Sequence, residues 1–294
     1  MSARRQRAHL RTLQPERQDV REHRRPARGG VGLAASLQTG ETPVLPAKQT
    51  GGQSLPVDIS TPSGSKLQRP FVLAHFAMTA DGKISTRSLT PSQFTSPADK
   101  RRLQEVRADS DAVLAGRGTV AADTMSMGLS AADLREKRVA SGRPPVPLRV
   151  IISNAGLLDL SWKVFSYRES PLVIFTSSRM PERVRQAVTR KAELYVFSGP
   201  AVDLGQALRI LRADFGVKRL VCEGGGTLLR SLAEQDLVDG IRLTIAPRIF
   251  GGRAAPTLTG LPGEFLSPLC PFRIVRHEKV GEECCLELRR IRPA

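Results

Sequence analysis

The sequence predicts an α/β domain built on a mostly parallel central sheet with helices on both faces. From Arg69 onward, short apolar segments alternate with segments that have the period of an amphipathic helix. Strands that alternate with helices pack as parallel neighbours in one sheet. The last two apolar segments have no helical segment between them. They are therefore predicted to form an antiparallel pair at one edge of the sheet.

The expected strands are short runs rich in apolar or β-branched residues. In chain order they are Phe71–Ala77, Ala112–Ala115, Arg149–Ser153, Leu172–Thr176, Leu194–Phe197, Arg219–Cys222, Ile241–Ala246, Phe272–His277 and Cys284–Leu288. The expected helices are Pro97–Ala108, Pro181–Lys191, Asp203–Asp214 and Thr227–Gln235. The Pro- and Arg-containing stretch Ser141–Pro147 is expected to be a loop inside the domain.

Residues 1–66 differ in composition and are predicted to be a disordered extension, which leaves 67–294 as the folded domain. The extension is rich in Arg up to Arg28 and then in Gly, Pro, Ser, Thr and Gln. Such a segment buries too little apolar surface to offset the entropy lost on ordering. An RNA-binding arm is one hypothesis for it, and an extension without a function is the simpler one.

The charge balance bounds the class of ligand. The formal net charge of +17 favours a polyanionic partner, either a nucleic acid or a small molecule. Residues 67–294 contain 34 Lys or Arg against 23 acidic residues, a modest excess that suits a site for several phosphates. We favour the small ligand over a nucleic acid.

Other composition signals argue against further classes. The four cysteines form no C-x-x-C pair, and two of the four histidines lie in the extension, so no metal site is expected. Reduced thiols are typical of a reducing compartment, and the cytoplasm is the expected location. No apolar run approaches the ~20 residues of a membrane span, so no membrane association is expected. The N-terminus has no apolar core of a secretory signal.

The most informative motif is the turn after the strand Arg219–Cys222, with the sequence C-E-G-G-G-T over Cys222–Thr227. Consecutive glycines let a ligand approach the backbone, because no Cβ lies in the way. The following helix offers free N–H groups and the positive end of its dipole. The motif therefore suits the pyrophosphate of a dinucleotide, although it lacks the G-x-G-x-x-G fingerprint.

A second glycine-containing turn follows the strand Ala112–Ala115. Gly116, Arg117, Gly118 and Thr119 stand at what looks like the start of another helix. Arg117 or the neighbouring hydroxyl groups are candidates to meet a ribose 2′-phosphate, which would favour NADPH over NADH. Two such turns on one sheet predict a dinucleotide or a similar phosphate ligand.

Two further motifs have structural explanations of their own. Ser96 is a good N-cap for a helix that begins at Pro97, with Asp99 in its first turn. Asp81-Gly82 is a turn signal at the end of the first strand. No nucleophile with a base emerges, which is compatible with hydride transfer, where a cofactor supplies the chemistry.

Five motifs, in order, resemble those of the riboflavin-biosynthesis pyrimidine reductases. They are A-M-T-A-D-G-K-I from Ala77, T-S-P at Thr95, D-A-V-L-A-G-x-G-T-V-x-x-D from Asp111, C-E-G-G-G-T-L from Cys222 and I-A-P-R-I-F-G-G from Ile245. The resemblance implies the fold of dihydrofolate reductase, a homodimer and NADPH as cofactor. It implies reduction of 5-amino-6-(5-phosphoribosylamino)uracil, or of the 2,5-diamino-pyrimidinone equivalent, to the ribitylamino product.

The resemblance also implies roles for individual residues. Glu223 and Asp81 are the expected catalytic residues, with Asp81 beside the nicotinamide. The substrate is expected to meet Thr95, Ser96, Arg107 and Glu223. The cofactor-binding residues implied are Ala77, Gly116, Gly118, Thr119, Asp123, Ser153, Gly224, Gly225, Gly226, Thr227 and Leu228.

One departure leaves the substrate open. The family has an acid, a proline and then a phosphate-binding arginine after Asp123, whereas this chain has T-M-S-M-G-L-S over Thr124–Ser130. Either Arg135, Arg138 or Arg143 replaces that arginine, or the substrate is a different pteridine, pyrimidine, imine or carbonyl compound. The extension contains no cysteine, so it cannot hold the zinc deaminase signature of the bifunctional relatives.

Overall fold

The computed structural model describes residues 57–59, 69–86, 94–260, 266 and 270–292. The chain divides into two compact units, Met1–Thr42 and Pro43–Ala294, and every described residue belongs to the second. Most of the predicted extension 1–66 thus lies outside the described residues. Within it the structure describes strand β1 (Val57–Ile59), which pairs in parallel with β6 (Glu193–Phe197). Three residues among Pro, Ser and Thr are too few to show a strand pattern in the sequence.

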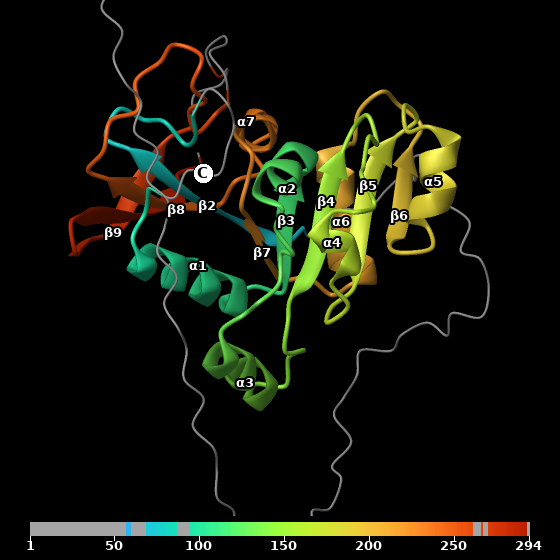
Figure 1. Ribbon diagram of the computed structural model, residues 1–294, viewed down its shortest axis with the longest axis horizontal. Coiled ribbons are helices and arrows are strands. Elements are labelled where there is room, and N and C mark those ends of the chain that lie inside the picture. The colour runs from blue at the N-terminus through green and yellow to red at the C-terminus, as the bar shows by residue number, and fades with distance from the viewer. Residues whose placement is uncertain (1–56, 60–68, 87–93, 261–265, 267–269, 293–294) are drawn as a thin grey trace, which may run out of the picture. The chain divides into compact units, whose positions relative to one another are not determined.

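The described strands form one sheet in the order β1-β6-β5-β4-β3-β7-β2-β8-β10-β9 (Figure 1). All pairings from β1 to β8 are parallel, whereas β10 pairs antiparallel with both β8 and β9. The mostly parallel sheet and its antiparallel C-terminal pair are therefore confirmed. The remaining strands are β2 (Phe71–Thr79), β3 (Ala112–Gly116), β4 (Leu148–Ser153), β5 (Leu172–Ser177), β7 (Arg219–Cys222), β8 (Gly240–Ala246), β9 (Phe272–Val280) and β10 (Glu283–Arg290).

Helices cover both faces of the sheet, because successive strand residues point to opposite sides. Val72 and Ala74 pack with α6 and α7, whereas Leu73 packs with residues of α1, α2, α4 and α5. Figure 1 shows α1, α2 and α4 in front of the sheet and α6 behind it. The helices are α1 (Pro97–Asp109), α2 (Arg117–Asp123), α3 (Ala132–Ala140), α4 (Lys163–Ser166), α5 (Glu182–Val188), α6 (Leu204–Asp214) and α7 (Gly226–Glu234).

Helices α3 and α4 are absent from the sequence-based prediction. Helix α3 is mostly polar and buries only Leu134 and Arg138, so it has no apolar stripe that would reveal it. Helix α4 is four residues long, too short for a helical period. Tertiary packing, rather than the local pattern, selects both helices.

The strand order brings residues from distant parts of the chain to one edge of the sheet. Strand β7 lies between β3 and β2, although β4, β5 and β6 precede it in the chain. Since these strands are parallel, the turns after β2, β3, β4 and β7 all lie at the carboxyl edge. Ligands of open α/β sheets bind at this edge, where the order of the strands changes direction.

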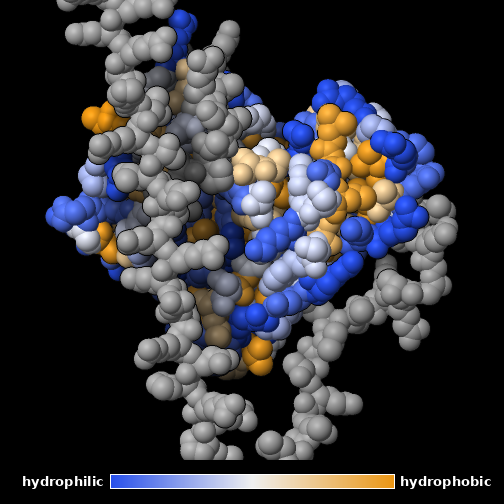
Figure 2. Space-filling view, in the orientation of Figure 1, coloured by the Kyte–Doolittle hydropathy of each residue, from blue (hydrophilic) through white to orange (hydrophobic). Residues whose placement is uncertain are grey.

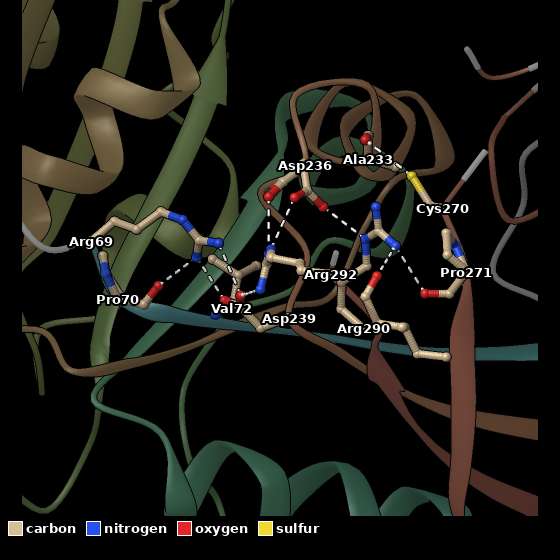
Figure 3. A network of polar contacts seen from close by, with 11 residues as sticks. Arg69, Pro70, Val72, Ala233, Asp236, Asp239, Cys270, Pro271, Arg290 and Arg292 are labelled. Carbon is tan, nitrogen blue, oxygen red and sulfur yellow. Dashed lines mark hydrogen bonds and ion pairs between the residues drawn. The ribbon is translucent and has the colours of Figure 1, made fainter. Parts of the chain in front are cut away.

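Ion pairs fasten the chain at the opposite, amino edge (Figure 3). Arg69 makes two bonds to the carboxylate of Asp239, at 2.6 and 2.9 Å. Asp236 accepts from Arg290 at 2.7 Å and from Arg292 at 2.9 Å. This amino-edge network joins the start of β2, the loop before β8 and the end of β10.

The described ranges contain neither a membrane-spanning helix nor a cluster of metal ligands. No helix there is long and apolar enough to cross a membrane. No group of three or more His, Cys, Asp or Glu side chains there is placed to hold a metal ion. All four cysteines are free thiols.

Candidate active site

The two glycine-containing turns meet at the carboxyl edge, as the sequence predicts. The N–H of Gly116 donates to the carbonyl of Gly224 at 2.7 Å, and the N–H of Glu223 donates to the carbonyl of Leu114 at 2.9 Å. A Cβ on Gly225 would lie 2.9 Å from Oγ1 of Thr119. The turns after β3 and β7 therefore form one continuous surface.

Helix α7 begins at this surface with its first N–H groups open. Its N-cap is Gly225, and no described side chain caps it. By contrast, Ser96 caps α1 and Asp203 caps α6 through side-chain oxygens. The first N–H groups of a helix have no partner within the helix, and its dipole favours an anion there. Helix α7 is thus the long helix at this edge that is suited to a phosphate.

Different structural features explain why glycine stands at each of the three positions Gly224, Gly225 and Gly226. Gly224 has a φ of 136°, which only glycine adopts without strain. A Cβ on Gly226 would lie 2.6 Å from Cα of Gly260 and 2.8 Å from the carbonyl oxygen of Thr257. Packing against that turn therefore accounts for Gly226, which was expected to bind cofactor. Gly225, like Gly224, leaves room beside Thr119 because it has no Cβ.

Arg107 and Glu223 form a buried ion pair, although α1 and β7 lie far apart in the sequence. Nε and Nη2 of Arg107 donate to the two carboxylate oxygens of Glu223, each at 2.6 Å. The two side chains are only 9% and 5% exposed. Burial disfavours the charge on Arg107, but the Glu223 carboxylate outweighs it and raises the pKa of the guanidinium. The structure thus brings together two of the expected substrate-binding residues.

Two more titratable groups feel the charge of Glu223. Asp123 ends α2 with an exposed side chain, and its pKa is raised because the surrounding protein displaces water and Glu223 is near. Burial lowers the pKa of His75 on β2 to about 4, against an opposing effect of Glu223. Nδ1 of His75 has no hydrogen-bond partner among the described residues. The side chain of His75 is therefore buried beside the Arg107–Glu223 pair.

Ser153 has a buried hydroxyl at the carboxyl edge of the sheet. It ends β4, next to β3 in the sheet, and is only 4% exposed. Its Oγ has no hydrogen-bond partner in the described part of the chain. A buried hydroxyl without a partner is uncommon in proteins. The Ser153 hydroxyl is therefore available for a hydrogen bond at the carboxyl edge.

Ser96 lies at the other end of α1 from Arg107, and its hydroxyl is already engaged. It accepts from the N–H of Asp99 at 3.2 Å, which confirms the predicted N-cap. It also donates to Oε2 of Glu283 at 2.6 Å. Since α1 has 13 residues, Thr95 and Ser96 stand roughly 18 Å from Arg107 along the helix. Glu283 is a buried partner that sequence analysis missed, because it stands in a polar stretch near the C-terminus.

Asp81 holds a loop in place. Its carboxylate accepts from Oγ1 of Thr79 at 2.5 Å and from the N–H groups of Phe250 and Gly251 at 3.2 and 2.7 Å. Hydrogen bonding, chiefly from Thr79, lowers the pKa of Asp81. The D-G turn thereby fastens the segment I-A-P-R-I-F-G-G to the end of β2. These contacts give Asp81 a structural role that was not part of its prediction as a catalytic residue.

The remaining expected residues divide by exposure. Thr227 and Gly118 are exposed at the starts of α7 and α2, where a ligand can reach them. Leu228 is buried and belongs to the hydrophobic core, so its side chain packs rather than contacts solvent. Ala77 is partly exposed on β2, opposite Thr244 of β8.

The three arginines considered as replacements for the phosphate-binding arginine have other partners. Arg138 is 1% exposed and donates to the carbonyls of Ala108 and Ser110 at the end of α1. Arg135 pairs with Glu169 at 2.5 Å, and Arg143 donates to Ser141. Arg138 is therefore excluded as a ligand for the substrate phosphate.

A cavity of about 510 Å³ lies away from the glycine turns, between α1, α3, β8, β9 and β10. Basic side chains line it, but several have acidic partners: Arg102 pairs with Glu278 at 2.7 Å and Arg101 with Glu105 at 3.1 Å. Because four of its seven basic side chains already have acidic partners, we place the ligand at the carboxyl edge instead.

The family model described as the RibD C-terminal domain matches residues 70–286. The chain belongs to this family. It is 38% identical over 214 residues to the 2,5-diamino-6-ribosylamino-4(3H)-pyrimidinone 5′-phosphate reductase of Archaeoglobus fulgidus, covering 73% of this chain and 95% of the relative. It is 35% identical over 221 residues to the protein of the same name from Methanothermobacter thermautotrophicus, covering 74% and 97%.

Solved structures of this family share the fold. A pyrimidine reductase-like protein of Corynebacterium diphtheriae superposes with a TM-score of 0.66 at 19% identity, covering 76% of this chain and 93% of that one. RibD of Acinetobacter baumannii gives 0.63 at 22% identity, covering 76% and 59%. The predicted α/β architecture is thus confirmed as that of the RibD-type reductases.

Proposed function

We propose that this chain is an NADPH-dependent reductase of riboflavin biosynthesis that converts a ribosylaminopyrimidine 5′-phosphate to its ribitylamino form. The observation that carries the proposal is the buried Glu223–Arg107 pair beside two touching glycine turns. The archaeal relatives that this chain covers almost completely are named for this reaction.

The site has separate parts for charge stabilisation and for cofactor binding. We expect the Glu223 carboxylate to stabilise the positive charge that develops on an iminium-like carbon of the opened sugar. Arg107 holds that carboxylate through two bonds and so fixes its orientation. Bound NADPH would supply the hydride for the reduction.

Three features of the carboxyl edge fit a phosphorylated dinucleotide. The open N–H groups of α7 suit its phosphates, and the unpartnered Oγ of Ser153 offers a buried hydrogen bond. Thr119 adds a hydroxyl between the two turns. Figure 2 shows hydrophilic and hydrophobic residues side by side on the face of the molecule in front of the sheet.

The decisive experiment is a steady-state assay of NADPH oxidation with the ribosylaminopyrimidine phosphate. We expect turnover that depends on both compounds, and tighter binding of NADPH than of NADH in a fluorescence titration. Tight binding of NADPH without turnover would contradict the substrate assignment while leaving the cofactor assignment intact.

A second candidate is a reductase of the same fold with another pteridine, pyrimidine, imine or carbonyl substrate. The observation that favours it is the engagement of Arg135 and Arg138 within the protein, together with the replaced segment Thr124–Ser130. The same assay run with unphosphorylated analogues separates the two candidates, because this substrate class does not need a phosphate.

We also propose a homodimer that forms in the cytoplasm. Strand β9 ends the sheet and exposes Ile274 and Val275 by 60% and 47%. An apolar edge strand is a ready surface for a second copy. Light scattering after size exclusion should give twice the chain mass, and Ile274→Lys should shift it to the monomer. The free thiols support a reducing compartment.

A further inference from the structure

The segment Thr124–Ser130 supports the Arg107–Glu223 pair. It connects α2 to α3 and turns inward, so that Met127 is fully buried and adopts a φ of 60°. The carbonyl of Gly128, the next residue, accepts from Nη1 of Arg107 at 2.6 Å. The segment that departs from the family pattern is therefore in direct contact with the ion pair.

The Gly128 carbonyl gives the third nitrogen of the buried Arg107 guanidinium a hydrogen-bond partner. Nε and Nη2 of Arg107 donate to the carboxylate of Glu223, and Nη1 donates to the carbonyl of Gly128. A buried guanidinium needs a partner for each donor, because water is not there to replace a missing one. If Gly128 moves, Arg107 must turn, and the carboxylate bound to it must follow.

Tyr167 fixes the position of Gly128. A Cβ at position 128 would lie 2.5 Å from Cζ and 2.6 Å from Oη of Tyr167, closer than atoms can approach. Only glycine therefore fits against the ring as it stands. The ring itself is held, because its hydroxyl donates to Glu169 at 3.1 Å.

Arg149 fastens Tyr167 and the segment to β4. It is 2% exposed, and its guanidinium lies 5.0 Å from the ring centroid of Tyr167. It donates to the carbonyls of Tyr167 and Val164 at 3.0 and 2.6 Å, and to that of Ser126 at 3.4 Å. A contiguous set of contacts thus runs from the core of the sheet to Glu223.

We propose that Gly128 and Tyr167 are positioning residues for the reaction: Tyr167 fixes Gly128, and the Gly128 carbonyl fixes the Arg107–Glu223 pair that faces the substrate. The segment Thr124–Ser130 then serves to orient the site rather than to bind a phosphate. The inference rests on the proposed function, because it takes Glu223 to act on the substrate.

A pair of substitutions tests the steric part. Gly128→Ala should lower kcat by about tenfold, since small displacements of reacting groups have large effects on rate. The Kd for NADPH should stay within about twofold. Gly128→Ala combined with Tyr167→Leu should regain part of the lost kcat, because leucine lacks the ring atoms that the new methyl group meets. The methyl group then fills part of the space that the ring leaves, whereas Tyr167→Leu alone leaves Gly128 without that support.

A spectroscopic measurement tests the same idea without turnover. The buried His75 feels the charges of both Glu223 and Arg107. Its imidazole resonances, identified by their loss in His75→Gln, should therefore shift in Gly128→Ala and return in the double variant. Gly199→Ala is the matched control, because a Cβ there meets only a carbonyl oxygen at 3.8 Å. It should change neither kcat nor the His75 signal.

The outcomes separate this inference from the proposed function. Absence of turnover by the unchanged chain sinks the function, and the His75 signal then decides the positioning role alone. A Gly128→Ala variant with an unchanged His75 signal, or a double variant no better than Gly128→Ala, overturns the inference. If Gly128→Ala does not fold, Tyr167→Leu alone must both shift the His75 signal and lower kcat, and failure of either overturns it.

Discussion

The two arginine–carboxylate systems of this protein lie at opposite edges of the same sheet and differ in burial. At the carboxyl edge, one guanidinium faces one carboxylate, and both are almost completely buried. At the amino edge, three arginines share two aspartates, and Asp236 is 42% exposed. The Arg107–Glu223 pair joins α1 to the turn after β7, beside the glycine turns. The amino-edge network joins the start of β2, the loop before β8 and the end of β10.

The comparison shows that the same type of ion pair can have different roles at the two edges of the sheet. A buried pair adds little net stability over apolar residues of the same size, because desolvation offsets its attraction, although removal of one partner alone is destabilising. The assignment of the Arg107–Glu223 pair to activity therefore rests on the two glycine turns beside it. The amino-edge network ties segments together near the C-terminus, away from the two glycine turns after β3 and β7. We therefore expect changes at the carboxyl edge to affect activity and changes at the amino edge to affect stability.

The largest expected effect is that of Glu223→Gln on turnover. The amide keeps the shape and one acceptor for Arg107 but loses the negative charge, so kcat should fall about a hundredfold. The Kd for NADPH should change little. Glu234→Gln, at an exposed pair with Arg230, is the control and should leave kcat unchanged. An unchanged kcat in Glu223→Gln would remove this carboxylate from the chemistry.

Gly225→Val should weaken cofactor binding. Its side chain would occupy the space beside Thr119 and the open N–H groups of α7, so the Kd for NADPH should rise by about tenfold. Gly199→Val serves as the control at a distant strand end. A fluorescence titration measures both, and equal Kd values would show that no phosphate approaches the backbone at Gly225.

Asp239→Ala, at the amino edge, should lower the stability of the protein and leave its activity unchanged. Asp239 is bound by Arg69, by Arg292 and by the N–H of Val72, so its loss should lower the free energy of unfolding by about 2 kcal/mol. The figure is below that of a fully buried pair, because Arg292 is 39% exposed. Glu105→Ala, at the exposed pair with Arg101, should cost less than about 1 kcal/mol. A drop in kcat of the folded Asp239→Ala variant would break the proposed division of roles.

The smallest expected effect is a pH dependence of the same network. Burial opposes ionisation of Asp239, but its bonds to Arg69 and Val72 prevail and lower the pKa below 3.8. The stabilisation is therefore complete above the unfolded value and is lost as the pH falls through the folded pKa. Urea unfolding should show a difference between the unchanged chain and Asp239→Asn that is full at pH 7 and shrinks at pH 3. A constant difference would mean that the charge of Asp239 does not matter.

The sheet could be predicted from the sequence because its strands are local apolar runs with clear boundaries. The cap at Ser96 and the two glycine turns could be predicted for the same reason, since each is a local pattern. The partners of these residues could not. The bond from Ser96 to Glu283, the ion pair of Arg107 with Glu223 and the packing of Gly226 on Gly260 all join distant parts of the chain. Local patterns hold no information about such contacts without the strand order.

Strand β7 comes late in the chain but lies between β3 and β2 in the sheet, so the active site can form only after β7 has been synthesised. Arg107 precedes Glu223 by 116 residues, so during synthesis the arginine leaves the ribosome long before its partner exists. The closure of such a long loop is slow compared with that of local structure. Because β7 and α7 supply both Glu223 and the longer glycine run, a chain that stops before β7 has no reductase site. Reductase activity can therefore be detected only from chains in which β7 has been synthesised and has entered the sheet.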